Sequence, residues 1–469
     1  MAKSIEDIRE EIRTTKANFI DLQFTDLLGT LKSVVIVPGE LDRAVERGYP
    51  FDGSSIEGFA RIAESDMRLM PDLRTYRQLP FENDALTTAR IVCDVVTPGG
   101  KSFEIDPRTV LKRAVEYASG LGFTFSVGPE LEFFLLRKEI DEEDLGHELK
   151  NCDEKPAKGS AGPTKGSVSV DDRIRRYFLD NGGYFDALTN DPGSIVRKEI
   201  MLGMGKVGIT PVMSHHEVAP SQHEIGIRYQ DALKMADDVI LYKHLVKSIA
   251  MKHGLKATFI PKLLSSENGS GMHVNLSLKR GKQNVFYSKT GRFHLSKTAE
   301  YFIGGLLKYI SEIAALTDPI PPSYDRLVPG YEAPVYRSWA DINRSALIRV
   351  PAIAPDEKNS SRIELRCPDP SCNPYLAFAA ILYAGMYGVE NSIRPPEPVG
   401  NKNLYKMSPE KRAELRIESL PGSLDEAVAN LADSRFAKAV FGGRFIKTYV
   451  RVKKEEIKKQ LPFKHYLNV

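Results

Sequence analysis

Cysteine is scarce in this sequence of 469 residues, and the cysteines that occur form no metal-binding pattern. No CxxC pair and no zinc-ligand spacing exists among the four, which are Cys93, Cys152, Cys367 and Cys372. This absence argues against a zinc ribbon and against a disulfide-stapled secreted fold. We therefore expect structural thiols in a reducing compartment.

Long apolar runs and one-sided charge are also absent. No stretch approaches 18 consecutive apolar residues, and the charged first 16 residues lack the apolar core of a signal peptide. The formal net charge of +3 gives no reason to expect a nucleic-acid partner. The densest basic stretch, 450–460, is interleaved with Glu455 and Glu456, which is typical of a solvated helix face. We expect a cytoplasmic protein that binds neither membrane nor nucleic acid.

A chain of this length is too long to fold around one ordinary hydrophobic core, so we expect at least two domains. Its composition, with 42% hydrophobic and 27% charged residues, is typical of a folded protein. The first hundred residues predict a compact unit of mixed helices and strands. Asp106 and Pro107 then fit the N-cap and first position of a helix that opens a second unit. In that unit we expect strands at 124–136, 256–264, 269–278, 345–353 and 360–366, helices at 231–253, 296–316 and 374–390, a surface insertion at 138–170 and a surface loop at 392–423.

Paired carboxylates mark the strand "GPELEFFLL". Glu130 and Glu132 share one face at positions i and i+2, while the apolar residues after them indicate an interior strand. Two buried like charges repel unless a cation lies between them or arginines pair with them. This segment alone leaves both explanations open.

Two further segments carry polar groups that ligand sites use. In "SHHEVAPSQHEIG", Glu217 and Glu224 flank a bend containing Pro220, which rules out a HExxH helix. "NGSGMHVNLSL" is a glycine-rich turn followed by a strand with His273, Asn275 and Ser277 on one face, and it is not a Walker A loop. Each segment alone is also explained by ordinary hydrogen-bonded structure.

Arginines complete the pattern, at Arg326, Arg344, Arg349, Arg362 and Arg366. In "SSRIELR" arginine, glutamate and arginine alternate with apolar residues, so they share one strand face. Carboxylates with one imidazole favour Mg²⁺ or Mn²⁺ over zinc, and arginine binds phosphate and carboxylate. Taken together, the residues predict metal-dependent phosphoryl transfer.

Five motifs in this order closely resemble glutamine synthetase of the bacterial and archaeal type I: "FDGSSIEGF", "NGSGMH", "RLVPGYEAPV", "NRSALIRVP" and "RIELRCPDPSCNPYLAFAA". The resemblance implies an α+β fold, with a β-grasp domain at 14–100 and, at 101–469, a catalytic domain whose curved antiparallel sheet is flanked by helices. It implies ligation of ammonium to L-glutamate by ATP through γ-glutamyl phosphate, giving L-glutamine. It also implies a dodecamer of two stacked hexamers, with active sites between adjacent subunits.

The same resemblance assigns roles to individual residues. It implies two or three Mg²⁺ or Mn²⁺ ions per site, one held by Glu132, Glu217 and Glu224 and another by Glu130, His273 and Glu364. Glutamate would contact Asn268, Gly269, Arg326, Glu332, Arg344 and Arg366. The nucleotide would contact Tyr229, Asn275, Ser277, Arg344, Arg349 and Arg362. Asp52 of an adjacent subunit would deprotonate ammonium, Glu332 would close a flap over the site, and Arg344 would assist catalysis.

The sequence departs from the family pattern at several positions. Asn275 and Val212 replace residues that contact the nucleotide in some relatives, so ATP affinity is the property in question. Tyr405 and Arg61 match positions that are regulatory in other branches, but the context of Tyr405 differs and we expect no modification there. Two alternatives to glutamine synthesis are a ligase for a polyamine or methylamine and a non-catalytic relative. The FDGSS motif with Asp52 favours ammonium over the larger amines.

Overall fold

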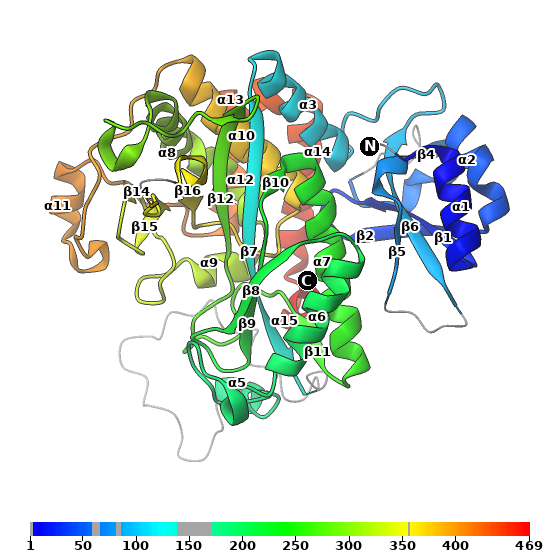
Figure 1. Ribbon diagram of the computed structural model, residues 1–469. Helices are drawn as coiled ribbons and strands as arrows, with labels where there is room; N and C mark the ends of the chain where they lie inside the picture. Colours follow the sequence, from blue (N-terminus) through cyan, green and yellow to red (C-terminus); the bar gives the residue numbers. More distant parts are fainter. Residues whose placement is uncertain (1–2, 59–65, 81–85, 138–169, 355–356) are drawn as a thin grey trace.

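A computed structural model of the chain describes residues 3–58, 66–80, 86–137, 170–354 and 357–469, and it contains two separate sheets (Figure 1). The N-terminal sheet has the strand order β2-β1-β6-β4-β3, with β5 paired to β6. The β1–β6 pair is parallel and the other pairs are antiparallel. Its elements are α1 (Ile5–Thr15), β1 (Phe19–Thr25), β2 (Leu31–Ile36), α2 (Leu41–Arg47), β3 (Tyr49–Asp52), β4 (Asp66–Pro71), β5 (Arg77–Gln78) and β6 (Thr88–Val96).

The second sheet forms the centre of the larger domain and has the order β14-β15-β16-β12-β7-β9-β8. Three short strands extend it, with β10 and β11 on β7 and β13 on β12. All of its pairs are antiparallel except β14–β15, so the expected antiparallel sheet has one parallel pair at its edge. Its strands are β7 (Thr124–Leu136), β8 (Pro211–His216), β9 (Gln222–Ile227), β10 (Gln230–Asp231), β11 (Lys256–Thr258), β12 (Met272–Arg280), β13 (Gln283–Asn284), β14 (Tyr336–Ala340), β15 (Ala346–Arg349) and β16 (Ile363–Leu365).

Strand β12 shows how the sequence gives this sheet two different faces. Met272, Val274 and Leu276 are at most 1% exposed, and they alternate with the polar side chains of His273 and Asn275. Because successive strand side chains point to opposite faces, the apolar set packs into the core and the polar set lies on the other face. That second face carries the candidate site.

Helices cover the apolar side of the large sheet. Helix α10 is apolar around almost its whole circumference, as expected of a helix buried on all sides, and it packs against α3, α7 and α8. The helices of this domain are α3 (Pro107–Gly120), α5 (Val170–Arg175), α6 (Ser194–Lys206), α7 (Ala232–Lys252), α8 (Lys297–Thr317), α9 (Pro321–Arg326), α10 (Pro374–Glu390), α11 (Pro409–Glu414), α12 (Leu424–Asp433), α13 (Arg435–Phe441), α14 (Gly443–Lys459) and α15 (Phe463–Tyr466).

Several sequence expectations need correction. The segment around Pro220 is a hairpin of β8 and β9 rather than a bend alone, and the expected loop at 392–423 contains α11. The strand expected at 256–264 is only three residues long. Helix α14 is not solvated throughout: Lys453 and Glu456 are 2% and 9% exposed and form an ion pair of 2.8 Å. Because the two opposite charges are buried as a pair, a helix with a Lys–Glu pattern can pack against the core.

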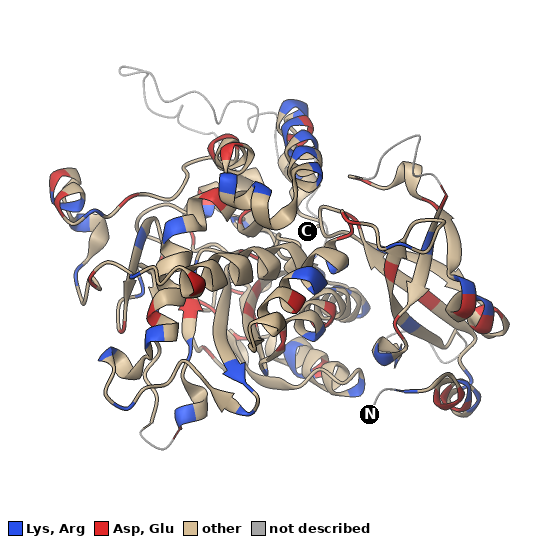
Figure 2. Ribbon diagram, turned by 90° about the horizontal axis from the view of Figure 1, so that it is seen from above, with Lys and Arg blue, Asp and Glu red and all other residues tan. Residues whose placement is uncertain are grey.

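The charge distribution agrees with the small net charge. Basic and acidic residues are interspersed along the helices (Figure 2). Among the described residues, no helix is both long and apolar enough to cross a membrane. Cys93, Cys367 and Cys372 are buried free thiols, while Cys152 and the expected insertion at 138–170 lie, apart from residue 170, outside the described residues.

Candidate active site

Strand register brings the predicted acidic residues onto one face of the large sheet. Across β7 and β12, Glu130 lies opposite His273, and across β7 and β9, Glu132 lies opposite Glu224. Glu364 of β16 pairs in register with both its neighbouring strands. Residues distant in sequence therefore form two adjacent rows of charge.

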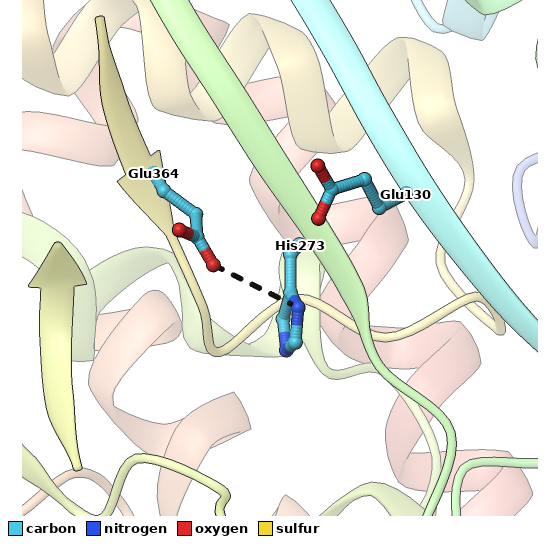
Figure 3. A group of neighbouring side chains, drawn as sticks. All are labelled: Glu130, His273 and Glu364. Carbon is cyan, nitrogen blue, oxygen red and sulfur yellow. Dashed lines mark ion pairs between the residues drawn. The ribbon is translucent and has the colours of Figure 1, made fainter. Parts of the chain in front are cut away.

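The first group consists of Glu130, His273 and Glu364, whose potential ligand atoms all lie within 4.8 Å of one another (Figure 3). The His273 Nδ1 atom lies 3.8 Å from a Glu364 oxygen. Burial, together with the Glu364 charge, raises the pKa of Glu130. Burial and then Arg366 hold the pKa of His273 well below its usual value, so its ring is neutral and can donate a lone pair to a metal.

The second group consists of His215, Glu217 and Glu224, again with ligand atoms within 4.8 Å. His215 Nε2 lies 2.7 Å from Glu217 Oε1. Burial first, and then the neighbouring carboxylates, raise the pKa of Glu224 well above its usual value. The sequence did not single out His215 as a ligand, although the "SHHE" motif contained it.

Glu132 lies beside this second group and not among its three members. Its carboxylate accepts hydrogen bonds from the Gly271 backbone N–H at 2.9 Å and from Gln222 Nε2 at 3.1 Å. Burial, followed by the charge of Glu217, raises its pKa to about 8. Like Glu130 and Glu224, Glu132 is costly to ionise in this structure.

The donor atoms fit hard divalent cations. The raised pKa values of the buried carboxylates indicate that their negative charges are not compensated by the surrounding groups. A cation between them would supply the missing positive charge. Carboxylate oxygens with one imidazole per group suit Mg²⁺ or Mn²⁺ better than softer metals. Both groups therefore have the chemistry of a metal site.

Arginines border the first group, as the strand pattern predicted. Arg349 and Arg366 both form ion pairs with Glu364. Arg362 donates from Nε to Asn275 Oδ1 at 3.0 Å, and the Asn275 amide donates to Glu130 at 2.9 Å. Asn275 therefore links an acidic ligand candidate to an arginine.

The glycine-rich turn before β12 packs directly against Arg326. This arginine is 3% exposed and donates to the Cys367 and Arg366 carbonyl oxygens at 2.6 and 3.1 Å. A Cβ atom at Gly269 would lie 2.2 Å from a backbone oxygen, so no other residue fits there. Asn268 precedes this turn and is half-buried.

The segment that carries Glu332 has an unusual backbone. Glu332 has a φ of +58°, a region that residues other than glycine rarely adopt. Its carboxylate lies 3.8 Å from Arg344, and both side chains are more than half exposed. The Tyr405 hydroxyl donates to the Ala333 carbonyl oxygen at 2.6 Å, and burial raises the Tyr405 pKa to about 12.

The remaining predicted residues are placed less closely. Ser277 lies on the same β12 face as His273, and Tyr229 is 52% exposed, with Lys279 Nζ 4.8 Å from its ring centre. Asp52 is exposed, belongs to β3 of the N-terminal sheet and is a member of neither acidic group. Val212 is exposed on β8, and Arg61 lies outside the described residues.

The sequence analysis missed one aromatic residue at the site. Tyr184 stacks on Phe185 and meets the His215 ring edge-on at 5.5 Å. Burial, and then the Glu217 charge, raise the pKa of its hydroxyl. An aromatic pair after two glycines, "GGYF", was the only sequence signal.

Comparison with known proteins identifies the family. The model for "Glutamine synthetase, catalytic domain" matches residues 104–465, and the model for "Glutamine synthetase, beta-Grasp domain" matches residues 16–98. The chain belongs to the glutamine synthetase family. It is therefore a glutamate–ammonia ligase that uses ATP to make glutamine, which confirms the family and activity predicted from the motifs.

Relatives extend over almost the whole chain. The glutamine synthetase of Thermotoga maritima is 47% identical over 455 residues, which are 97% of this chain and 96% of the relative. That of Methanosarcina mazei is 46% identical over 451 residues, or 96% and 93% of the two chains. Among solved structures, a GmaS/ADP complex has a TM-score of 0.80 at 28% identity and covers 98% of this chain and 97% of that chain.

Proposed function

We propose that two divalent cations, Mg²⁺ or Mn²⁺, bind at the two acidic groups of this glutamine synthetase. Glu130, His273 and Glu364 would hold one, and Glu217 and Glu224, with Glu132 beside them, would hold the other. The observation that carries the proposal is the packing of both groups on one sheet face with raised carboxyl pKa values. Bound there, the cations would neutralise phosphoryl oxygens during transfer from ATP.

Side chains around the first group would orient the two substrates. Arg326 and Arg366, with the Asn268–Gly269 turn, would bind the carboxylate of glutamate, because guanidinium groups pair with carboxylates in a fixed geometry. Arg349 and Arg362 would face the nucleotide phosphates. These arginines are already held by neighbouring groups, so they bind with little loss of conformational freedom.

Other nucleotide contacts would come from the exposed side of the sheet. Tyr229 would lie against the adenine ring, and Ser277 and Asn275 would contact the nucleotide along β12. Arg344, which lies beside Glu332, would approach the phosphates. The solved GmaS/ADP complex, which is 28% identical, supports nucleotide binding by a chain of this fold.

Ammonium would be handled between subunits. Asp52 is exposed on the N-terminal domain of its own chain, so it would reach the site of an adjacent subunit in a ring. There it would take a proton from ammonium, which cannot attack while charged. Glu332 would close the entrance and exclude water from γ-glutamyl phosphate. We therefore propose that the subunits assemble into a dodecamer of two stacked hexamers. We also propose that the protein is cytoplasmic.

The experiment is glutamine formation measured with ATP, Mg²⁺ and ammonium. Glu364→Gln should abolish it and leave the assembly size unchanged in light scattering. Glu455→Gln, an exposed substitution on α14, is the matched control and should be fully active. An active Glu364→Gln enzyme would contradict the metal assignment. Faster phosphate release with methylamine or putrescine than with ammonium would contradict the proposed role of Asp52.

A further inference from the structure

The β8–β9 hairpin carries two histidines that face away from the acidic groups. His216 and His223 lie opposite each other across the two strands, and their rings meet at 5.1 Å. Each is adjacent in sequence to a proposed metal ligand, Glu217 or Glu224. Because neighbouring strand residues point to opposite faces, the ring on the back fixes the backbone that carries the carboxylate on the front.

One buried aspartate holds the turn of this hairpin. Asp180 Oδ1 accepts hydrogen bonds from the His216 ring at 2.9 Å and from the Ser221 backbone N–H at 2.9 Å. The other ring nitrogen of His216 donates to the Glu217 carbonyl oxygen at 2.7 Å. The side chains of His216 and Asp180 are 0% and 5% exposed. Asp180 therefore holds the backbone on both sides of Glu217.

A second buried group holds the other strand. Arg197 donates to His223 Nδ1 at 2.7 Å, and it forms a two-point ion pair with Asp191 at 2.9 and 2.6 Å. A guanidinium only donates, so Nδ1 of His223 must be the acceptor. His223 is 0% exposed, and Phe133 of β7 packs on its ring at 5.8 Å. The ring next to Glu224 is therefore held by a hydrogen bond at one nitrogen and by packing against Phe133.

The backbone of residues 180–197 fits closely over both rings. A Cβ atom at Gly193 would lie 2.5 Å from the His223 ring, and one at Gly182 would lie 3.0 Å from the His216 ring. Such contacts leave no room for a side chain at Gly193 unless the ring moves. Residues 180–197 therefore contact the hairpin through close van der Waals packing as well as through hydrogen bonds.

We propose that residues 180–197 position the metal-binding carboxylates of Glu217 and Glu224 from behind the hairpin, through Asp180 and Arg197. Neither residue belongs to the acidic groups themselves, so both are positioning residues. Groups that orient metal ligands typically change metal affinity 10- to 100-fold when they are removed. This inference rests on the proposed metal site at Glu217 and Glu224.

The test is Mn²⁺ binding by isothermal titration to the metal-free full chain, without nucleotide. We expect Asp180→Ala and Arg197→Gln to weaken one Mn²⁺ site at least tenfold, and Asp180→Asn, which keeps an oxygen acceptor, to recover most of the loss. Gly193→Ala, which changes no charge, should also weaken that site. Lys453→Met is the matched control, because it removes the cation of a buried ion pair on a different element, α14.

Calorimetric unfolding of each variant separates loss of fold from loss of the site. The proposal is supported if Lys453→Met lowers the unfolding temperature as much as Arg197→Gln but leaves Mn²⁺ affinity within twofold. It is overturned if the folded Asp180→Ala and Arg197→Gln variants bind Mn²⁺ within twofold of the wild type, or if the control weakens binding equally. Glu224→Gln tests the site itself: if it loses no Mn²⁺, the metal assignment fails, whatever the positioning variants show.

Discussion

The raised pKa of Glu132 predicts that the metal-free protein becomes less stable as the pH rises. Burial and the charge of Glu217 raise this pKa from 4.5 to about 8. Between these values the folded chain keeps a proton at Glu132 that the unfolded chain has released, so the free energy of unfolding falls with increasing pH. The loss begins near pH 4.5 and is complete above about pH 8.

The structure sets the size of the effect. One pKa unit corresponds to about 1.4 kcal/mol, so Glu132 alone lowers the free energy of unfolding by at most about 5 kcal/mol across this range. Glu130 and Glu224 also have raised pKa values, and they change stability in the same direction. Whole domains are stable by only about 5–15 kcal/mol, so the change should be large enough to measure. A cation bound to the carboxylates should remove it.

The assay is differential scanning calorimetry with EDTA at pH 5.5 and pH 8 at constant ionic strength. The wild type should unfold several degrees lower at pH 8, and Mg²⁺ should abolish most of this difference. Glu132→Gln keeps the acceptor for its neighbours but cannot ionise, so its unfolding temperature should depend less on pH. The exposed Glu455→Gln should behave like the wild type. If Glu132→Gln shows the full pH dependence, the reasoning is refuted.

Three further variants test separate contacts. Asn275→Ala breaks the link between Glu130 and Arg362, and it should raise the KM for ATP severalfold more than the KM for glutamate in steady-state kinetics. Gly269→Ala places a Cβ atom against a backbone oxygen, and it should raise the KM for glutamate at least tenfold; an unchanged KM would exclude that turn from the glutamate site. Tyr405→Phe removes one hydrogen bond, and it should cost about 1 kcal/mol in urea unfolding while glutamine synthesis persists.

Local patterns predicted the elements that carry most of the site. Helices α7, α8 and α10 lie within one residue of the ranges expected from apolar periodicity and caps. Strand β12 was recognisable because its apolar and polar residues alternate, and strand β7 because it contains a continuous apolar run of strand length. Long helices and strands whose buried residues recur with a regular spacing can therefore be predicted from the sequence alone.

The β8–β9 hairpin shows why other parts were not. Its site residues His215, His216, Glu217, His223 and Glu224 are all polar, so no apolar alternation marks the part of the hairpin that carries the site. Tertiary contacts from residues 180–197 hold the buried rings of His216 and His223 on the back face of the hairpin. Such contacts join residues about 26 to 36 positions apart, which no local pattern reveals.

The strand 362–366 shows how two explanations of buried charge can hold together. The sequence left open whether paired carboxylates mean a metal or salt bridges with arginine, and Glu364 takes part in both arrangements. It pairs with Arg349 and Arg366, yet its other close neighbour is the neutral ring of His273 in the first acidic group. Each carboxylate oxygen has more than one lone pair, so guanidinium groups can fix the orientation of the carboxylate while lone pairs remain for a metal. On this strand the salt bridges and the proposed metal need not exclude each other, because one carboxylate belongs to both arrangements.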